Sequence, residues 1–220
     1  MPGMDTARTP LVLTVANMKG GSAKTTTAAF IAHALHKRGL SVLVVDADPQ
    51  GSALRWSETG DWPFPVIGLP VRTIHTQLAG LVGARDVTII DTPPLDAQAG
   101  IVASALRAAT YVVIPTAPTP IEIDRLPAVR AALDDSGPAR TSGAPPPAAV
   151  LFTRTVPLAT STRVWRDALT SAGWSVLVTE VRRLERIAQA YGDRLTDAAS
   201  TGYGYVAEEL LNRACREASR

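Results

Sequence analysis

Cysteine, lysine and long apolar runs are scarce in this chain, and each shortage excludes a class of protein. Because Cys215 is the only cysteine, the chain can form neither an internal disulfide nor a cysteine-held iron–sulfur cluster. No apolar stretch reaches the roughly 18 to 20 residues that a membrane helix needs, and Met1 to Pro10 lacks the pattern of a secretory signal. We therefore expect a cytoplasmic protein without stable membrane association.

The few lysines are concentrated in one place. Only Lys19, Lys24 and Lys37 are lysine, and the first two fall within one glycine-rich loop, whereas every other basic side chain is arginine. The wide guanidinium of arginine does not replace a compact ammonium inside a phosphate cradle, so lysine kept there indicates chemistry. The net charge of +2, from 22 basic and 20 acidic residues, neither requires nor excludes a nucleic-acid partner.

Short apolar, β-branched runs alternate with helical patterns along the chain. The expected strands are Pro10–Asn17, Ser41–Asp46, Asp86–Asp91, Tyr111–Pro115 and Ala148–Thr153. The expected helices are Thr25–Arg38, Asp96–Ala108, Ile121–Leu133, Thr160–Ala172, Arg182–Tyr191 and Tyr203–Ala218. This order predicts an α/β fold, a doubly wound and mostly parallel sheet flanked by helices, in one domain over residues 1–220.

Three stretches do not follow the alternation. Residues 1–9 are expected to be a flexible N-terminus. Prolines interrupt every period in Trp56–Pro70, which we expect to be irregular with one short edge strand. Ser136–Pro147 is rich in proline and glycine and is expected to be an exposed loop.

The strongest pattern is NMKGGSAKTT at residues 17–26, between an expected strand and an expected helix. Glycines let backbone N–H groups turn inward, and the new helix adds free N–H donors and its positive end. Lys24 supplies a mobile cation, and Thr25 would place its hydroxyl on Mg²⁺. The alternative is a plain glycine-rich turn. The predicted phosphate-binding residues are Lys19, Gly20, Gly21, Ser22, Ala23, Lys24, Thr25 and Thr26.

Carboxylates follow two of the expected strands. Asp46 and Asp48 come at the end of one strand, and Asp91 ends another. Ligands of open α/β sheets collect at these carboxyl ends, where carboxylates can hold Mg²⁺ or orient an attacking water. Each pattern alone is weak, since acidic residues also cap helices. The glycine-rich loop, the pair Asp46 and Asp48, and Asp91 form a specific combination when they follow one another in this order.

With these elements the chain resembles the ParA/MinD group of deviant Walker ATPases, which are P-loop NTPases, and within it the short, ParF-like partition proteins. The runs at residues 48–51, 114–120 and 152–154 also resemble those proteins. The resemblance implies that Lys24 holds the β and γ phosphates and that Asp48 orients the hydrolytic water. It also implies a metal site from Thr25, Asp46 and Asp91, and a nucleotide contact from Arg154.

The same resemblance implies a slow, partner-stimulated ATPase that partitions plasmid or chromosomal DNA, with ATP or ADP and Mg²⁺ as cofactors. Lys19, which has no evident role in its own subunit if Lys24 serves the phosphates, would reach the partner's phosphates in a nucleotide-dependent homodimer. A solvated surface lysine is the alternative. The ATP form would bind DNA nonspecifically, associate with the nucleoid and meet a centromere-binding adaptor protein.

A group of arginines near the C-terminal end is the candidate DNA contact. A solvated helix face is the alternative, because Glu180, Glu185 and Asp193 are interspersed. The candidate residues are Arg182, Arg183, Arg186 and Arg194.

One departure from the family pattern bears on activity. The family's glycine before the loop lysine is Ala23 here, and at a positive φ alanine would cost on the order of 1 kcal/mol. Two further functions stay open: a MinD-like switch that positions membrane or protein cargo, and a nucleotide-dependent binding module that hydrolyses almost nothing. A tyrosine kinase of related fold is disfavoured, because Lys19 in the loop indicates the ParA/MinD pattern instead.

Overall fold

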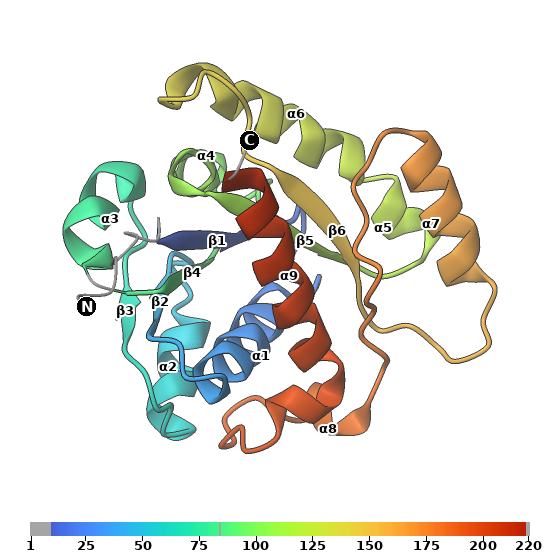
Figure 1. Cartoon of the computed structure of the whole chain (residues 1–220), viewed down its shortest axis with the longest axis horizontal. Helices are drawn as coiled ribbons and strands as arrows, with labels where there is room; N and C mark the ends of the chain where they lie inside the picture. The colour runs from blue at the N-terminus through green and yellow to red at the C-terminus, as the bar shows by residue number, and fades with distance from the viewer. Residues whose placement is uncertain (1–9, 84, 219–220) are drawn as a thin grey trace, which may run out of the picture.

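The computed structural model describes residues 10–83 and 85–218, and within them six parallel strands form one sheet (Figure 1). Val15, Asp46 and Asp91 are register partners at the ends of β1, β2 and β4, so these three carboxyl ends lie side by side. The strands are β1 (Leu11–Val15), β2 (Val42–Asp46), β3 (Val66–Gly68), β4 (Val87–Asp91), β5 (Tyr111–Thr116) and β6 (Ala148–Phe152), in the spatial order β3-β2-β4-β1-β5-β6.

Helices connect the strands and continue after the last one. They are α1 (Lys24–Lys37), α2 (Ser52–Thr59), α3 (Ile74–Val82), α4 (Ala99–Ala108), α5 (Pro120–Ile123), α6 (Leu126–Ser136), α7 (Ser161–Ser171), α8 (Glu185–Ala188) and α9 (Tyr203–Ala218). Two short 3-10 helices lie at Gly137–Ala139 and Ala198–Thr201.

The two faces of the sheet support separate cores. Leu13 and Val15 point into a core shared with α1, α2 and α9. Val12 and Ile114 point to the opposite face, which α3, α4 and α6 cover. Strands buried on both faces need apolar residues at nearly every position, which explains their continuous apolar runs. The predicted doubly wound α/β fold is confirmed.

A hydrogen bond inside the first core joins α9 to the start of α1, and Figure 1 shows these two helices side by side. The hydroxyls of Thr27 and Tyr203 lie 3.1 Å apart in the protein interior. Burial raises the pKa of Tyr203 to about 12, with the Thr27 hydroxyl acting in the opposite direction. The last helix is thereby fixed to the element that follows the glycine-rich loop.

Two predicted helices are wrong in extent. The segment Ile121–Leu133 contains two helices, because Pro120 is the first residue of α5 and Pro127 is the second residue of α6, each in the first turn where proline is tolerated. In the segment Arg182–Tyr191, only four residues form a helix. The backbone N–H of Arg183 donates to the Thr155 carbonyl at 2.9 Å, so an extended pairing replaces the first turn of the predicted helix.

The irregular stretches are only partly irregular. The short edge strand predicted within Trp56–Pro70 is β3, whereas neither α2, which contains Trp56, nor α3 was predicted. In Ser136–Pro147, α6 and a 3-10 turn occupy the first four residues, and residues 141–145 are exposed. The predicted flexible segment 1–9 lies outside the described residues. No helix in the described part of the chain has the length and apolar character needed to cross a membrane.

Candidate functional site

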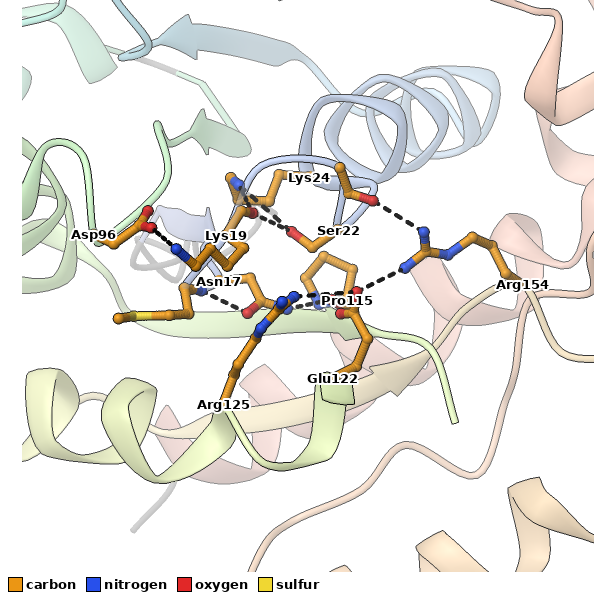
Figure 2. A network of polar contacts seen from close by, with 11 residues as sticks. Asn17, Lys19, Ser22, Lys24, Asp96, Pro115, Glu122, Arg125 and Arg154 are labelled. Carbon is orange, nitrogen blue, oxygen red and sulfur yellow. Dashed lines mark hydrogen bonds and ion pairs between the residues drawn. The ribbon is translucent and has the colours of Figure 1, made fainter. Parts of the chain in front are cut away.

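The loop between β1 and α1 is anchored to the sheet by Asn17 (Figure 2). The Asn17 side-chain amide donates to the Pro115 carbonyl at 2.7 Å, and its side-chain oxygen accepts the Met18 N–H at 2.5 Å. Asn17 is buried, so these bonds fix the point where the loop leaves β1. The sequence assigned Asn17 no role, although a buried amide directly after a strand is the available signal.

The loop contains two residues with left-handed backbone. Gly21 has φ of +73° and Ala23 has φ of +65°. Ala23 directly precedes α1, and its carbonyl accepts the Thr27 N–H at 2.9 Å. Residue 23 therefore has the positive φ at which an alanine is expected to be strained. The loop keeps its turn in spite of the alanine and presents the first turn of α1, a position suited to anions.

Lys24 is 7% exposed, and its ammonium turns back onto the loop. Nζ donates to the Lys19 carbonyl at 2.8 Å and lies 3.4 Å from the Ser22 hydroxyl. Burial lowers the pKa of Lys24, while Asp91 and Asp48 act in the opposite direction. Both direct partners are uncharged, so this buried ammonium is placed to receive an anion.

Asp46 and Asp48 follow one another where β2 meets α2. Asp46 accepts the N–H groups of Asp48 at 3.1 Å and Leu54 at 2.9 Å, and Asp48 accepts the Gln50 N–H at 2.9 Å. Burial raises the pKa of Asp46, and the Leu54 and Asp48 N–H groups oppose this shift. Asp46 therefore anchors the turn after β2, whereas the half-buried Asp48 is the more accessible carboxylate.

Asp91 is a fully buried carboxylate for which the described residues supply no hydrogen-bond partner at normal geometry. Burial raises its pKa to about 7, and the Thr25 hydroxyl and the Lys24 ammonium act in the opposite direction. Such a group fits a cation that the protein alone does not provide. Hydroxyl and carboxylate oxygens from Thr25, Asp46 and Asp91 are the donors that Mg²⁺ prefers.

The protein alone does not form a metal cage in this region. No cluster of three or more histidine, cysteine, aspartate or glutamate side chains with metal-binding geometry occurs among residues 10–83 and 85–218. Mg²⁺ commonly binds through one or two protein groups together with substrate phosphates and waters. The donor set here fits that mode.

Lys19 has an ion-pair partner in its own chain, which the sequence did not predict. Its ammonium lies 2.5 Å from the Asp96 carboxylate, and the two side chains are 49% and 28% exposed (Figure 2). The sequence missed Asp96 because a single acidic residue at the expected start of a helix has no distinctive spacing.

Arg154 contacts the loop on the side away from Asp96, as Figure 2 shows. It donates to the Gly21 carbonyl at 2.9 Å and lies 3.6 Å from Glu122, which is also 3.7 Å from Arg125. Arg154 has a left-handed φ of +57°, a conformation that costs energy outside glycine. The structure therefore brings Arg154 to the predicted site. Glu122, which the sequence did not single out, is its counter-charge.

The four candidate DNA contacts differ in their surroundings. Arg182 and Arg183 are exposed on the extended segment beside Thr155. Arg186 donates to the Ser200 carbonyl at 3.1 Å and lies 3.9 Å from Asp197. Arg194 lies 3.7 Å from Asp61. Only Arg186 lies within α8, so the alternative interpretation, a single solvated helix face, does not describe the four arginines.

The model of the CobQ/CobB/MinD/ParA nucleotide binding domain family matches residues 13–196. The chain belongs to this family. The match begins within β1 and spans the other five strands, the loop and all three candidate carboxylates. It confirms the predicted ParA/MinD relationship and the predicted class of nucleotide-binding ATPase.

Several curated members of the ParA/MinD family are similar in sequence. The "Maintenance of carboxysome distribution protein A" of Halothiobacillus neapolitanus is 31% identical over 175 residues, 78% of this chain and 79% of the relative. The protein of the same name from Gloeobacter kilaueensis is 43% identical over 117 residues, 52% of each chain. The "Chromosome-partitioning ATPase Soj" of Thermus thermophilus is 34% identical over 134 residues, 47% of this chain and 53% of Soj. The last two matches span about half of each relative.

Solved structures share the fold. A putative plasmid partition protein of Borrelia burgdorferi bound to AMPPNP has a TM-score of 0.72 at 19% identity, covering 93% of this chain and all of that one. The cobyrinic acid a,c-diamide synthase of Mycobacterium smegmatis, bound to an ATP analog and magnesium, has a TM-score of 0.72 at 24% identity, covering 93% and 96%. The predicted cofactors, ATP or ADP with Mg²⁺, are those of solved structures with this fold.

Replacing Ala23 by glycine should stabilise the protein. Glycine adopts a φ of +65° without the clash that alanine suffers, although it gains more freedom in the unfolded chain. We expect the free energy of unfolding to rise by about 0.5–1 kcal/mol in urea denaturation. The control Ala131→Gly, at an exposed position inside α6, should lower it by about 1 kcal/mol. A loss of stability in Ala23→Gly would contradict the strained turn.

Replacing Asp91 by asparagine should remove a pH-dependent loss of stability. The Asp91 carboxyl keeps its proton up to about pH 7 in the folded chain, compared with 3.8 for an unperturbed aspartate. The folded state therefore binds more protons in that window, and the free energy of unfolding falls as pH rises through it.

Between pH 5 and pH 8, the wild type should lose about 2–3 kcal/mol more than Asp91→Asn, in urea unfolding without nucleotide. The exposed control Asp134→Asn should behave as the wild type. Equal losses in wild type and Asp91→Asn would show that Asp91 is ionised throughout.

Proposed function

We propose that the chain is a ParA-type positioning ATPase that binds MgATP, dimerises around it and hydrolyses it slowly. The observation that carries this proposal is that two buried charged groups of opposite sign lie at this site and neither is directly bonded to a group of opposite charge. The buried Lys24 ammonium has uncharged partners, and the buried Asp91 carboxylate has no hydrogen-bond partner at normal geometry among the described residues. A triphosphate with its Mg²⁺ supplies the missing anion and the missing cation together.

Each residue of the loop has a role in this proposal. The backbone N–H groups hold the phosphates, and the hydroxyl of Thr25 with the carboxylates of Asp46 and Asp91 hold Mg²⁺ directly or through water. Asp48, the accessible carboxylate after β2, orients the attacking water. Bound Mg²⁺ neutralises charge on the transferred phosphoryl group. The proposed phosphate contacts also include Lys19, Gly20, Gly21, Ser22, Ala23 and Thr26. Arg154 contacts the loop at the Gly21 carbonyl.

The homodimer follows from Lys19. Its side chain is half exposed at the phosphate loop, while Lys24 occupies the interior, so Lys19 would offer a second ammonium to a neighbouring molecule once it leaves Asp96. The symmetric arrangement would place each Lys19 at the nucleotide of its partner. A module that only binds and hardly hydrolyses was suggested by Ala23. Because the loop keeps its left-handed turn at that residue, we favour hydrolysis.

The cargo is the second question. DNA partitioning is supported by the similarity to Soj, and it would require a centromere-binding adaptor. The two relatives named for carboxysome distribution favour a second candidate, a protein assembly positioned over DNA. Both candidates use nonspecific DNA binding by the ATP dimer, which would associate the protein with the nucleoid. A membrane cargo is less favoured, since Val206, Ala207 and Leu210 bury the apolar face of α9 in the core.

Replacing Lys24 by alanine should abolish useful MgATP binding. Loss of a charge-assisted contact to phosphate should weaken binding by about 30- to 100-fold in calorimetry, and ATP turnover should fall to background. Lys24→Arg should fail similarly, because the guanidinium is wider.

The control is Lys37→Ala, which removes the exposed third lysine at the other end of α1. It should bind MgATP as the wild type does. Unchanged affinity in Lys24→Ala, or no MgATP binding by the wild type at millimolar nucleotide, would refute the proposed function.

Removing Arg182 and Arg183 together should reduce DNA binding by the ATP form. If each contacts a phosphate, the slope of log affinity against log salt should become shallower by about 2 for the double alanine variant. Fluorescence anisotropy with a random-sequence duplex between 50 and 200 mM salt measures this slope. The control is the double variant Arg72→Ala, Arg85→Ala, beside α3. An identical slope in both double variants would place the DNA surface elsewhere.

A further inference from the structure

The ion pair between Lys19 and Asp96 is built into the backbone around it. The N–H of Leu95 donates to the Asn17 carbonyl, and the N–H of Asp96 donates to the Met18 carbonyl, both at 3.2 Å. The segment after β4 therefore runs beside the first residues of the phosphate loop. These bonds place the Asp96 carboxylate next to Lys19, where its oxygen lies 2.5 Å from the ammonium (Figure 2).

Lys19 makes two contacts of different kinds. Its side chain pairs with Asp96, and its backbone carbonyl accepts the Lys24 ammonium at 2.8 Å. A phosphate that attracts the Lys24 ammonium would compete with the Lys19 carbonyl for it. Nucleotide binding would therefore change a hydrogen bond of the Lys19 backbone, while Asp96 holds the Lys19 side chain.

An ammonium held by Asp96 does not reach a phosphate of another molecule at the same time. We propose that Asp96 is a positioning residue that retains Lys19 in its own chain and opposes formation of the ATP dimer until phosphates compete for the ammonium. This inference rests on the proposed function, since it assigns regulation to the same loop. In this scheme Asp96 contacts neither the nucleotide nor the attacking water, and it acts through Lys19.

The position of Asp96 in the chain adds a second link. It follows Asp91, the proposed metal carboxylate, by five residues, and Pro93 and Pro94 stiffen the connection. The Thr92 N–H and hydroxyl both donate to the Val15 carbonyl, at 3.3 and 2.8 Å, which fixes the start of this segment to β1. The metal carboxylate and the carboxylate that holds Lys19 are therefore two ends of one short, anchored segment.

The size of the effect follows from the exposure of the pair. Partly exposed ion pairs change an equilibrium by a factor of about two to five. Each of the two subunits gives up one such pair on dimerisation. Removing the Asp96 charge should therefore lower the dimer dissociation constant in MgATP by about four- to twenty-five-fold.

The test measures dimer dissociation constants by sedimentation velocity in saturating MgATP, with Asp48→Ala present throughout to block hydrolysis. Asp96→Asn removes the charge and keeps the shape. Asp134→Asn makes the same change at an exposed site on α6 and is the matched control. We expect tighter dimers with Asp96→Asn and unchanged dimers with Asp134→Asn. Weaker or unchanged dimers with Asp96→Asn would overturn the inference.

A double-mutant cycle separates this role from a merely structural one. In a Lys19→Ala background, whose weaker dimers are measured at correspondingly higher protein concentration, Asp96→Asn should leave the dissociation constant unchanged, because the ammonium that Asp96 holds is absent. An equal effect with and without Lys19 would overturn the inference, since Asp96 would then act independently of Lys19.

MgATP affinity of the monomer, measured at nanomolar protein with a fluorescent nucleotide, distinguishes the two levels of failure. Normal MgATP binding and dimerisation with no response to Asp96→Asn would overturn the role of Asp96 alone. Absence of MgATP binding, or of ATP-dependent dimers, in the Asp48→Ala protein and all its variants would overturn the proposed function and this inference together.

Discussion

Opposite charges buried at the ends of three neighbouring parallel strands are the constraint around which this chain is organised. The register of β1, β2 and β4 sets Val15, Asp46 and Asp91 side by side, and Lys24, the first residue of α1, lies close enough to Asp91 for their charges to interact. Burying an ammonium and a carboxylate without direct pairing is unfavourable. The apolar cores on both faces of the sheet stabilise a fold that accepts this cost where a ligand can compensate it.

Much of the fold could be predicted because its signals are local. Continuous apolar runs mark strands buried on both faces, and the glycine-rich loop lies between a strand and a helix. Even the left-handed backbone at Ala23 follows from the loop pattern, since glycine is the residue that such a position favours. Asp46, Asp48 and Asp91 were found because they end strands, and parallel strands bring their ends together.

The missed features depend on contacts between distant segments. Asp96 and Glu122 act through the geometry of side chains, and neither has a spacing that distinguishes it from other acidic residues. The extended conformation at Arg182 and Arg183 arises from pairing with Thr155, which outweighs a local preference for helix. The break between α5 and α6 was readable in principle, because Pro127 cannot lie in the interior of a helix.

Thr155 and Arg154 are consecutive in the chain, and this adjacency has a mechanical consequence. The Arg154 guanidinium donates to the carbonyl of Gly21, while the carbonyl of Thr155 holds the segment that carries Arg182 and Arg183. The glycine-rich turn and the segment that carries Arg182 and Arg183 are therefore attached to two neighbouring residues of the chain. One side-chain hydrogen bond, one peptide unit and one backbone hydrogen bond join the candidate nucleotide loop to the candidate DNA surface.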